Sequence, residues 1–140
     1  MGSMKAIAPM EDLAAVRFYE ELSQRRLMFP RCRACARTFV PPRSRCSRCL
    51  SPELMWVKAP RRGTLYAFTK QGIGLRFARN VLGVVELALE DAPARILTRI
   101  DAQLADLRIG MTMELDFIDA GDGVLLHQFR PLKPVGDVLP

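Results

Sequence analysis

Apolar side chains recur at helical spacing near the start of the chain. Leu13, Val16, Tyr19 and Leu22 lie about one turn apart, which predicts a helix over residues 12–24. Two acidic residues at the start of this segment suit the positive end of a helix dipole. The chain therefore opens with an amphipathic helix that buries one face.

After this helix the pattern becomes that of short strands. Two are predicted at 27–31 and 54–58, on either side of the stretch that holds all four cysteines. A helical turn is predicted at 101–108. From Arg61 onward the remaining signals favour strands over 63–70, 81–89, 95–100, 111–117 and 124–129, with a loop over 71–80. Five strands with a helical turn between the third and the fourth match the order of an OB-fold barrel.

The same pattern divides the chain into four parts. Residues 1–30 are interpreted as an expression scar followed by the helical segment, and 31–60 as a zinc ribbon. Residues 61–131 form the barrel, and 132–140 an irregular tail. The expected fold class is mainly β, with an N-terminal helix, a zinc ribbon and a C-terminal five-stranded OB-fold barrel.

The four cysteines give the most specific chemical signal. Cys32 and Cys35 form one C-x-x-C pair, and Cys46 and Cys49 form a second pair after a spacer of ten residues. Each pair places two thiolates on one tight knuckle, and two knuckles complete a tetrahedral Zn²⁺ site. Four thiolates close the coordination shell, so the zinc is expected to be structural rather than catalytic. Two disulfides, or a redox or iron–sulfur site, remain as alternatives.

Composition and charge narrow the function classes. About half of the residues are hydrophobic (49%), enough for a packed core, and no apolar run approaches the roughly 20 residues that cross a bilayer. No secretory signal is evident, so a cytoplasmic location is expected. Residues 1–79 hold 16 Lys/Arg and 5 Asp/Glu, whereas residues 80–140 hold 5 and 10. This asymmetry indicates an anionic partner: nucleic acid, a nucleotide-bearing cofactor or an acidic protein.

The chain offers little for catalysis. Its one histidine, His127, lies in an alternating strand and has no evident catalytic partners. Gly72 and Gly74 with Arg76 are too few to form a phosphate cradle, and no nucleophile motif is present. The residues therefore favour a binding protein over an enzyme.

Several motifs together resemble one known family. The similarity extends from residue 12 to 131, and its motifs are Phe18-Tyr19, the two cysteine pairs, Pro41-Pro42, Trp56-Val57, the segment Arg62-Gly63-Thr64-Leu65-Tyr66-Ala67-Phe68-Thr69, Val84-Val85-Glu86-Leu87, Ile109-Gly110-Met111 and Phe129-Arg130-Pro131. With them the chain resembles the zinc-ribbon plus OB-fold proteins that associate with acyl-CoA enzymes, known as domain-of-unknown-function family thirty-five.

This resemblance implies a rubredoxin-like zinc ribbon and a small non-catalytic subunit. The partners that it implies are thiolases, hydroxymethylglutaryl-CoA synthases, ketosynthase-like acyltransferases, MaoC-like hydratases or lipid-transfer-protein-type aldolases. The sequence departs from the family pattern at Ala36, where a glycine is usual, and at the loop 72–80, which lacks the usual prolines.

The expected function is a non-catalytic accessory subunit that binds acyl-CoA, assembles with a larger catalytic partner, or does both, in acyl-CoA or polyketide metabolism. Arg61, Arg62, Arg76 and Arg79 are the candidates for the phosphates of coenzyme A, because guanidinium groups bind phosphate with charge-assisted hydrogen bonds. Trp56 is the candidate for stacking on adenine. A single-stranded nucleic-acid binder is the alternative, since OB folds and zinc ribbons both serve that role. A pure assembly module is a third possibility.

Overall fold

The computed structural model of the chain describes residues 13–70 and 81–132. None of its helices is long and apolar enough to cross a membrane, as far as these residues extend. The elements along the chain are α2 (Leu13–Ser23), β1 (Met28–Cys32), β2 (Leu54–Lys58), β3 (Arg62–Lys70), β4 (Val81–Ala88), β5 (Pro93–Ile100), the 3₁₀ turn η1 (Leu104–Asp106), β6 (Thr112–Asp119) and β7 (Leu125–Pro131).

The barrel strands follow the predicted OB order. They close in the sequence β3-β4-β5-β7-β6, and η1 lies between β5 and β6. The mainly β fold class, with its N-terminal helix, four-cysteine ribbon and five-stranded barrel, is therefore confirmed. β5 begins at Pro93, two residues before the predicted start, because its ladder with β4 continues to the pair Ala88 and Pro93. The predicted loop 71–80 lies outside the described residues.

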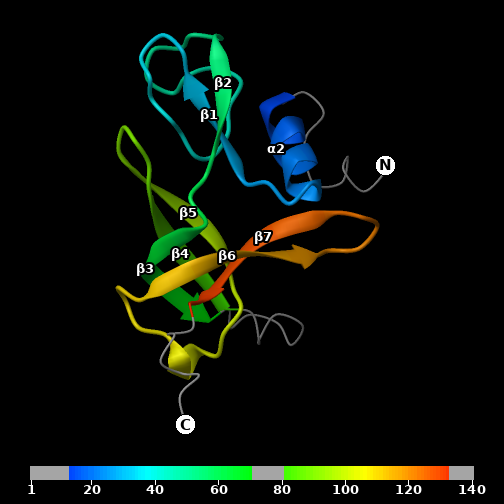
Figure 1. The fold of residues 1–140 in the computed structure, drawn as a ribbon, viewed down its shortest axis with the longest axis vertical. Helices are drawn as coiled ribbons and strands as arrows, with labels where there is room; N and C mark the ends of the chain where they lie inside the picture. The colour runs from blue at the N-terminus through cyan, green and yellow to red at the C-terminus, as the bar shows by residue number, and fades with distance from the viewer. Residues whose placement is uncertain (1–12, 71–80, 133–140) are drawn as a thin grey trace.

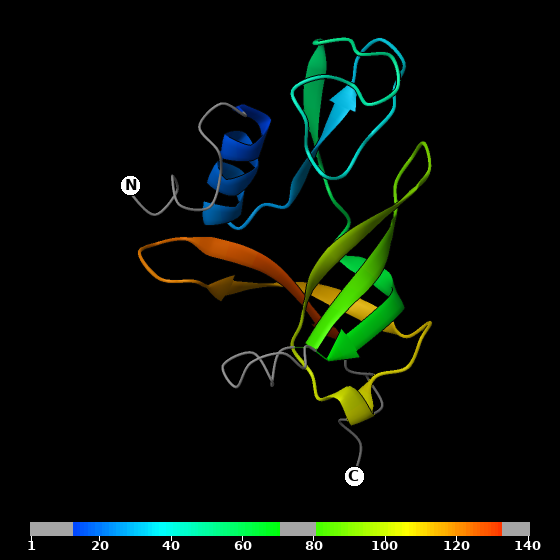
Figure 2. The ribbon, with the colours of Figure 1, turned by 180° about the vertical axis from the view of Figure 1, so that it is seen from behind.

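The ribbon stands at one end of the barrel, with α2 beside it (Figure 1). Its two strands pair antiparallel from Met28 and Lys58 to Cys32 and Leu54, and the metal-binding loops extend from the far end of this hairpin. The hairpin of β6 and β7 projects from the barrel beneath α2, as the view from behind also shows (Figure 2). The helix therefore lies against the side of the barrel rather than over its end.

One hydrophobic core joins the three parts. Phe18 and Leu22 of α2 are buried together with Leu27, which precedes β1, and with Phe29 of β1. Side chains inside the barrel complete this core. The barrel strands pack closely at Gly63, where an added Cβ would lie 2.6 Å from a Val85 methyl carbon. Glycine is needed at this position because no side chain fits there.

Polar contacts fix the ribbon to the β4–β5 turn. The backbone N–H of Thr38 donates to Asp91 Oδ2 at 3.0 Å, and Arg31 Nη1 lies 2.8 Å from Glu90 Oε2. Burial raises the pKa of Asp91, but hydrogen bonds from Thr38 and from the Asp91 backbone, together with the charge of Arg31, outweigh burial and lower the pKa below its usual value. The Asp91 carboxylate is thus held ionised where ribbon and barrel meet.

His127 is a half-buried residue of β7. Its Nδ1 lies 2.8 Å from Thr98 Oγ1, and its ring meets Phe18 edge to face. Burial lowers the pKa of His127 from 6.5 to about 4, because the charged form loses hydration inside the protein.

This burial predicts a stability loss in mild acid. Below pH 6.5 the unfolded chain protonates His127, whereas the folded chain keeps it neutral until about pH 4. The unfolded state then binds more protons, so the free energy of unfolding falls by about 3 kcal/mol as the pH drops through this window. In His127→Gln this component should vanish, which urea titrations at pH 4.5 and 7 would measure. An equal pH dependence in both proteins would contradict the prediction.

Candidate functional site: a four-cysteine metal centre and an arginine-lined groove

The four cysteine sulfurs converge at the far end of the ribbon. Cys32 Sγ lies 3.5 Å from Cys49 Sγ, and Cys35 Sγ lies 3.5 Å from Cys46 Sγ. All four ligand atoms lie within 4.8 Å of one another. A tetrahedron of Zn–S bonds has edges of about 3.8 Å, so the arrangement fits Zn²⁺ with small adjustments.

The backbone of each knuckle is shaped for this purpose. Ala36 N–H donates to the carbonyl of Cys32 at 2.9 Å, and Leu50 N–H donates to the carbonyl of Cys46 at 3.0 Å. Both Ala36 and Leu50 have φ of +66°, the left-handed region that glycine adopts most easily. Alanine therefore makes this turn at a cost of about 1 kcal/mol.

Hydrogen bonds and crowding affect the thiols in opposite ways. The N–H of Cys49, followed by that of Arg48, lowers the pKa of Cys46 to about 6. The N–H of Ser51 lowers the pKa of Cys49, but the sulfur of Cys32 and its neighbours raise it to about 11. Four thiolates therefore need a cation among them, which structural zinc supplies. With all four positions taken by sulfur, the metal keeps no site for water or substrate.

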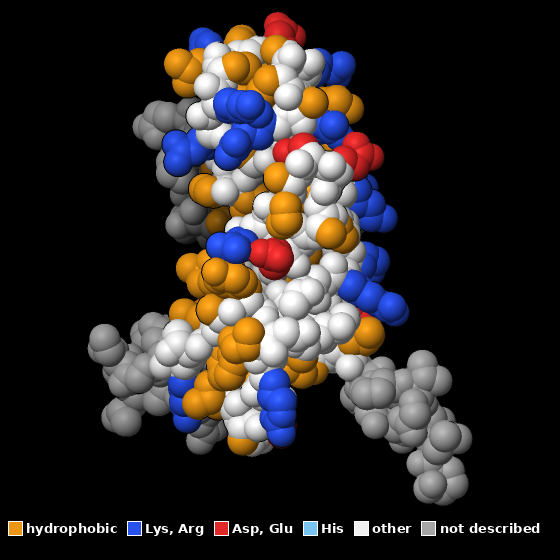
Figure 3. Space-filling model, turned by 90° about the vertical axis from the view of Figure 1, so that its left-hand side faces the viewer, with side chains coloured by type: hydrophobic (Ala, Val, Ile, Leu, Met, Phe, Trp, Pro, Cys, Tyr) orange, Lys and Arg blue, Asp and Glu red, His pale blue; other side chains and the backbone are white. Residues whose placement is uncertain are grey.

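A groove of about 1160 Å³ separates the ribbon from the barrel. Its volume lies slightly above the range of about 300–1,000 Å³ that is typical of ligand sites. Figure 3 shows Lys and Arg side chains gathered over the part of one face that the ribbon occupies. Four arginines and one glutamate line the groove, with apolar side chains between them: Arg37, Arg43, Arg45, Arg95 and Glu86, together with Phe39, Val40, Pro41, Leu50, Pro93 and Ala94.

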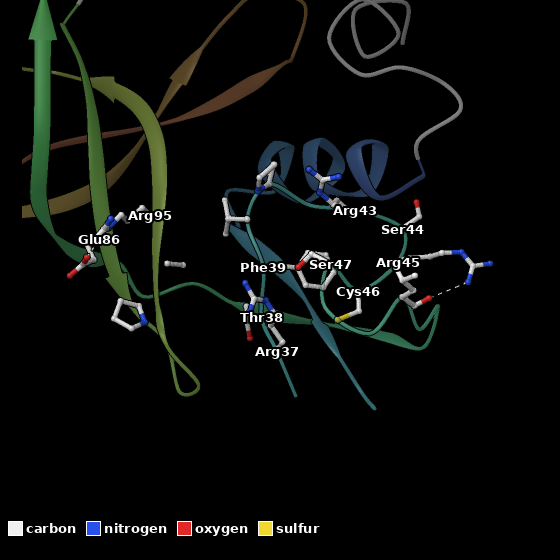
Figure 4. Close-up of a pocket in the computed structure, with 15 residues that line it drawn as sticks. Arg37, Thr38, Phe39, Arg43, Ser44, Arg45, Cys46, Ser47, Glu86 and Arg95 are labelled. Carbon is white, nitrogen blue, oxygen red and sulfur yellow. Dashed lines mark hydrogen bonds and ion pairs between the residues drawn. The ribbon is translucent and has the colours of Figure 1, made fainter. Parts of the chain in front are cut away.

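Two neighbouring side chains hold Arg95 in place. Its guanidinium carbon lies 3.8 Å from the centre of the Tyr66 ring, and its Nε donates to Glu86 Oε2 at 3.0 Å. Both contacts hold the planar group in place and leave its terminal amino groups for a ligand. In Figure 4, Arg95 lies beside Glu86 on the barrel side of the groove, whereas Arg45 lies on the ribbon and donates to the carbonyl of Leu50.

Three of the five predicted acyl-CoA residues lie in the part of the chain that the structure describes. Arg61 and Arg62 are exposed where the chain enters β3, and Arg62 lines a smaller hollow that shares Glu86 and Pro93 with the groove. Trp56 packs against the core, with the Arg17 guanidinium 5.1 Å from its ring centre. Arg76 and Arg79 lie outside the described residues.

The groove residues were only partly visible in the sequence. The arginines between the two cysteine pairs are visible in the sequence only as a local excess of positive charge. No sequence motif singles out Arg95 as a groove residue. It follows Arg37 by 58 positions, and only the fold brings the two side chains to one groove.

Comparison with known proteins agrees with this architecture. Residues 20–54 match the family model of the ChsH2 rubredoxin-like zinc ribbon domain. A solved structure described as an Ltp2-ChsH2(DUF35) aldolase is 28% identical, with a TM-score of 0.75, and the match covers 89% of this chain and 98% of that one.

Two further matches differ in how much of each chain they cover. A probable enoyl-CoA hydratase alpha subunit of Thermomonospora curvata is 30% identical over 118 residues, covering 84% of this chain but only 37% of that protein. A DUF35 protein of unknown function from Sulfolobus solfataricus has a TM-score of 0.59 at 14% identity, covers 94% of this chain and 95% of that one, and shows the shared fold alone.

The sulfur geometry predicts one tightly bound zinc per chain. Elemental analysis of Cys46→Ser should show most of the metal lost, and the β1–β2 ribbon should lose its protection from proteolysis, because metal binding and local folding are coupled. Arg33→Gln is the matched control, since it changes an exposed side chain of the first knuckle without removing a sulfur. A folded chain with two disulfides and no metal would refute the prediction.

Proposed function

Because the chain belongs to the ChsH2-type DUF35 zinc-ribbon family, we propose that it is a non-catalytic accessory subunit of an acyl-CoA-processing complex. It binds acyl-CoA in the groove between ribbon and barrel, while a larger partner performs the chemistry. The observation that carries this proposal is the arginine-lined groove beside a metal centre that has no open coordination position. The cytoplasmic location expected from the sequence goes with this role.

The relatives support the choice of partner. One carries the name of an enoyl-CoA hydratase subunit, and the solved structure is described as an aldolase formed with Ltp2. The chain spans 37% of the hydratase subunit, so that protein contains further segments which this chain does not match. An aldolase or hydratase is therefore the partner we propose first, ahead of a thiolase or a ketosynthase-like acyltransferase.

The chemistry of the groove supports the choice of ligand. Coenzyme A carries a pyrophosphate and a 3′-phosphate, and guanidinium groups pair with such anions in two-pronged hydrogen bonds. Arg37 and Arg43 present positive charge from the ribbon side, and Arg95 presents it from the barrel. Phe39 and Pro93 add apolar surface between them, which suits the adenine or the pantetheine arm. Arg62 extends this positive surface along β3.

A nucleic-acid role fits the structure less well. Single strands bind along rows of exposed aromatic side chains on which successive bases stack. Tyr66 is the one large aromatic side chain that stands well exposed among the described residues, and Arg95 already covers its ring. The face of Trp56 is likewise approached by Arg17. The barrel therefore offers no aromatic row in the part that the structure describes.

The groove predicts a specific loss of affinity in Arg95→Gln. Removing this ordered guanidinium should weaken acyl-CoA binding about tenfold in calorimetry, since a charge-assisted contact to phosphate is lost. Arg108→Gln removes an exposed arginine outside the groove and should bind like the wild type. Acyl-CoA should also bind more tightly than free coenzyme A, because the acyl chain buries apolar area.

A random oligonucleotide serves as the competitor in the same experiment. If the oligonucleotide binds tightly and acyl-CoA does not, the chain is a nucleic-acid binder. If neither binds and only a catalytic protein does, the chain is an assembly module. Equal losses in Arg95→Gln and Arg108→Gln would show that net charge, rather than the groove, governs binding.

A second prediction concerns turnover. We expect the isolated zinc-loaded chain to be silent in hydration, thiolysis, aldol cleavage and acyl transfer on a panel of acyl-CoAs. The only histidine is half-buried in β7 with a pKa of about 4, which makes it a poor base at neutral pH. Activity that stays with the chain through further purification steps, and that is lost in a groove variant, would overturn the accessory role.

A further inference from the structure

The two walls of the groove differ in charge. Between positions 37 and 50 the ribbon carries four arginines and no acidic residue, which outweighs the double negative charge of a zinc ion held by four thiolates. On the barrel side the charge of Arg95 is offset by Glu86, whose Oε2 accepts the Nε–H of Arg95 at 3.0 Å (Figure 4). The positive potential of the groove is therefore highest along the ribbon wall.

The ribbon wall also presents an exposed leucine to the groove. Leu50 is 67% exposed, whereas Phe39 of the same wall is buried and Val40 is half-buried. Arg45 Nη1 donates to the Leu50 carbonyl at 3.2 Å, so a guanidinium group is held beside this leucine. Apolar surface and positive charge thus lie next to each other on the ribbon.

The backbone of Leu50 is unfavourable for a leucine. Leu50 follows the second cysteine pair as Ala36 follows the first, and both have φ of +66°, which glycine adopts at the lowest cost. The exposed side chain of Leu50 gains little packing within the chain to offset this strain. Residues in strained backbone conformations cluster at ligand-binding sites. Leu50 lines the groove and Ala36 does not, so the leucine is placed to contact a ligand there.

We propose that acyl-CoA lies in the groove in one orientation, with its adenine on Leu50 and its pantetheine arm against the barrel. This inference rests on the proposed function, to which it adds the direction of the ligand and the residue that receives the base. The adenosine end joins a planar apolar base to a 3′-phosphate, and Leu50 with the neighbouring Arg43 and Arg45 offers the matching pair of surfaces. The pyrophosphate, between the two ends of the ligand, faces Arg95.

The uncharged pantetheine arm suits the barrel wall, where the charges of Arg95 and Glu86 are balanced. The reverse orientation would set the 3′-phosphate beside the Glu86 carboxylate and the neutral arm against the ribbon arginines. In the proposed orientation the arm leads toward the hollow of about 270 Å³ at Arg62 and Thr112, which shares Glu86 and Pro93 with the groove. The thioester end is thereby presented on the barrel, away from the metal centre.

The test uses calorimetry on the full zinc-loaded chain with two fragments of coenzyme A, adenosine 3′,5′-bisphosphate and 4′-phosphopantetheine. The wild type should bind the adenosine fragment more tightly, because that fragment carries the base and two phosphates. Leu50→Gly should weaken binding of the adenosine fragment about fivefold, since apolar contact area is lost, and should leave phosphopantetheine unchanged. Leu50→Asn should show the same loss, because asparagine tolerates a positive φ but offers no apolar surface.

Ala36→Gly is the matched control, since it makes the same backbone change in the first knuckle, outside the groove. It should leave the affinity for both fragments unchanged. Ribbon stability gives a readout of opposite sign: Leu50→Gly and Ala36→Gly should both release zinc to a chelator more slowly than the wild type, because glycine relieves the strain. A leucine that only supports the ribbon would behave in the other way, with faster zinc release in Leu50→Gly.

Faster zinc release in Leu50→Gly, or equal binding of the adenosine fragment by the wild type and both Leu50 variants, would overturn the proposal. A wild type that binds phosphopantetheine but not the adenosine fragment would overturn it as well. Titrating intact acyl-CoA into the same samples separates the two hypotheses. Affinity for acyl-CoA that Leu50→Gly leaves unchanged would sink only the orientation, whereas a wild type without affinity for acyl-CoA would sink the ligand role itself.

Discussion

The ribbon depends on the coordination of one metal by four sulfurs. Its own buried cluster consists of Cys32, Cys46 and Phe39, with Cys35 and Leu54 packed against them, which is far too small a core to hold two long loops. In the turns of these loops, Ala36 and Leu50 adopt a left-handed backbone conformation, which raises the energy of the folded ribbon. The metal bond energy offsets these costs, and the shape of the loops follows from it. One wall of the groove, with Arg37 and Arg43, is therefore as ordered as the zinc centre that supports it.

The second wall belongs to the barrel and does not depend on the metal. Arg95 is held by Glu86 of β4 and by Tyr66, which lies at a register shift of β3. The two walls keep a common geometry because the β4–β5 turn contacts the ribbon through Asp91, and because the core continues from the helix through Phe29 into the barrel. The groove is thus a product of two independently stabilised parts joined by one shared core.

The position of α2 explains why the barrel can close through only two residue pairs between β5 and β7, Arg99 with Gln128 and Ile100 with Phe129, without exposing its interior. The helix packs on β7 and β1, and Phe18 and Leu22 fill space next to His127 that a longer β5–β7 pairing would otherwise cover. The interior is sealed by side chains, while the backbone edge of β5 stays open.

The sequence by itself determined the elements and the metal site, because both depend on local order. The spacing of Cys32, Cys35, Cys46 and Cys49 specifies two knuckles, and apolar periodicity specifies the helix and five barrel strands in their OB order. It also excluded His127 as an evident base. Only the tertiary structure decided which arginines share a site. Arg95 joins Arg37 because strand pairing and the Asp91 contact bring distant segments together, whereas the sequence favoured Arg61 and Arg62 for their proximity along the chain. Likewise the short pairing of β5 with β7 depends on twist and on the packing of α2, neither of which a one-dimensional pattern of residues records.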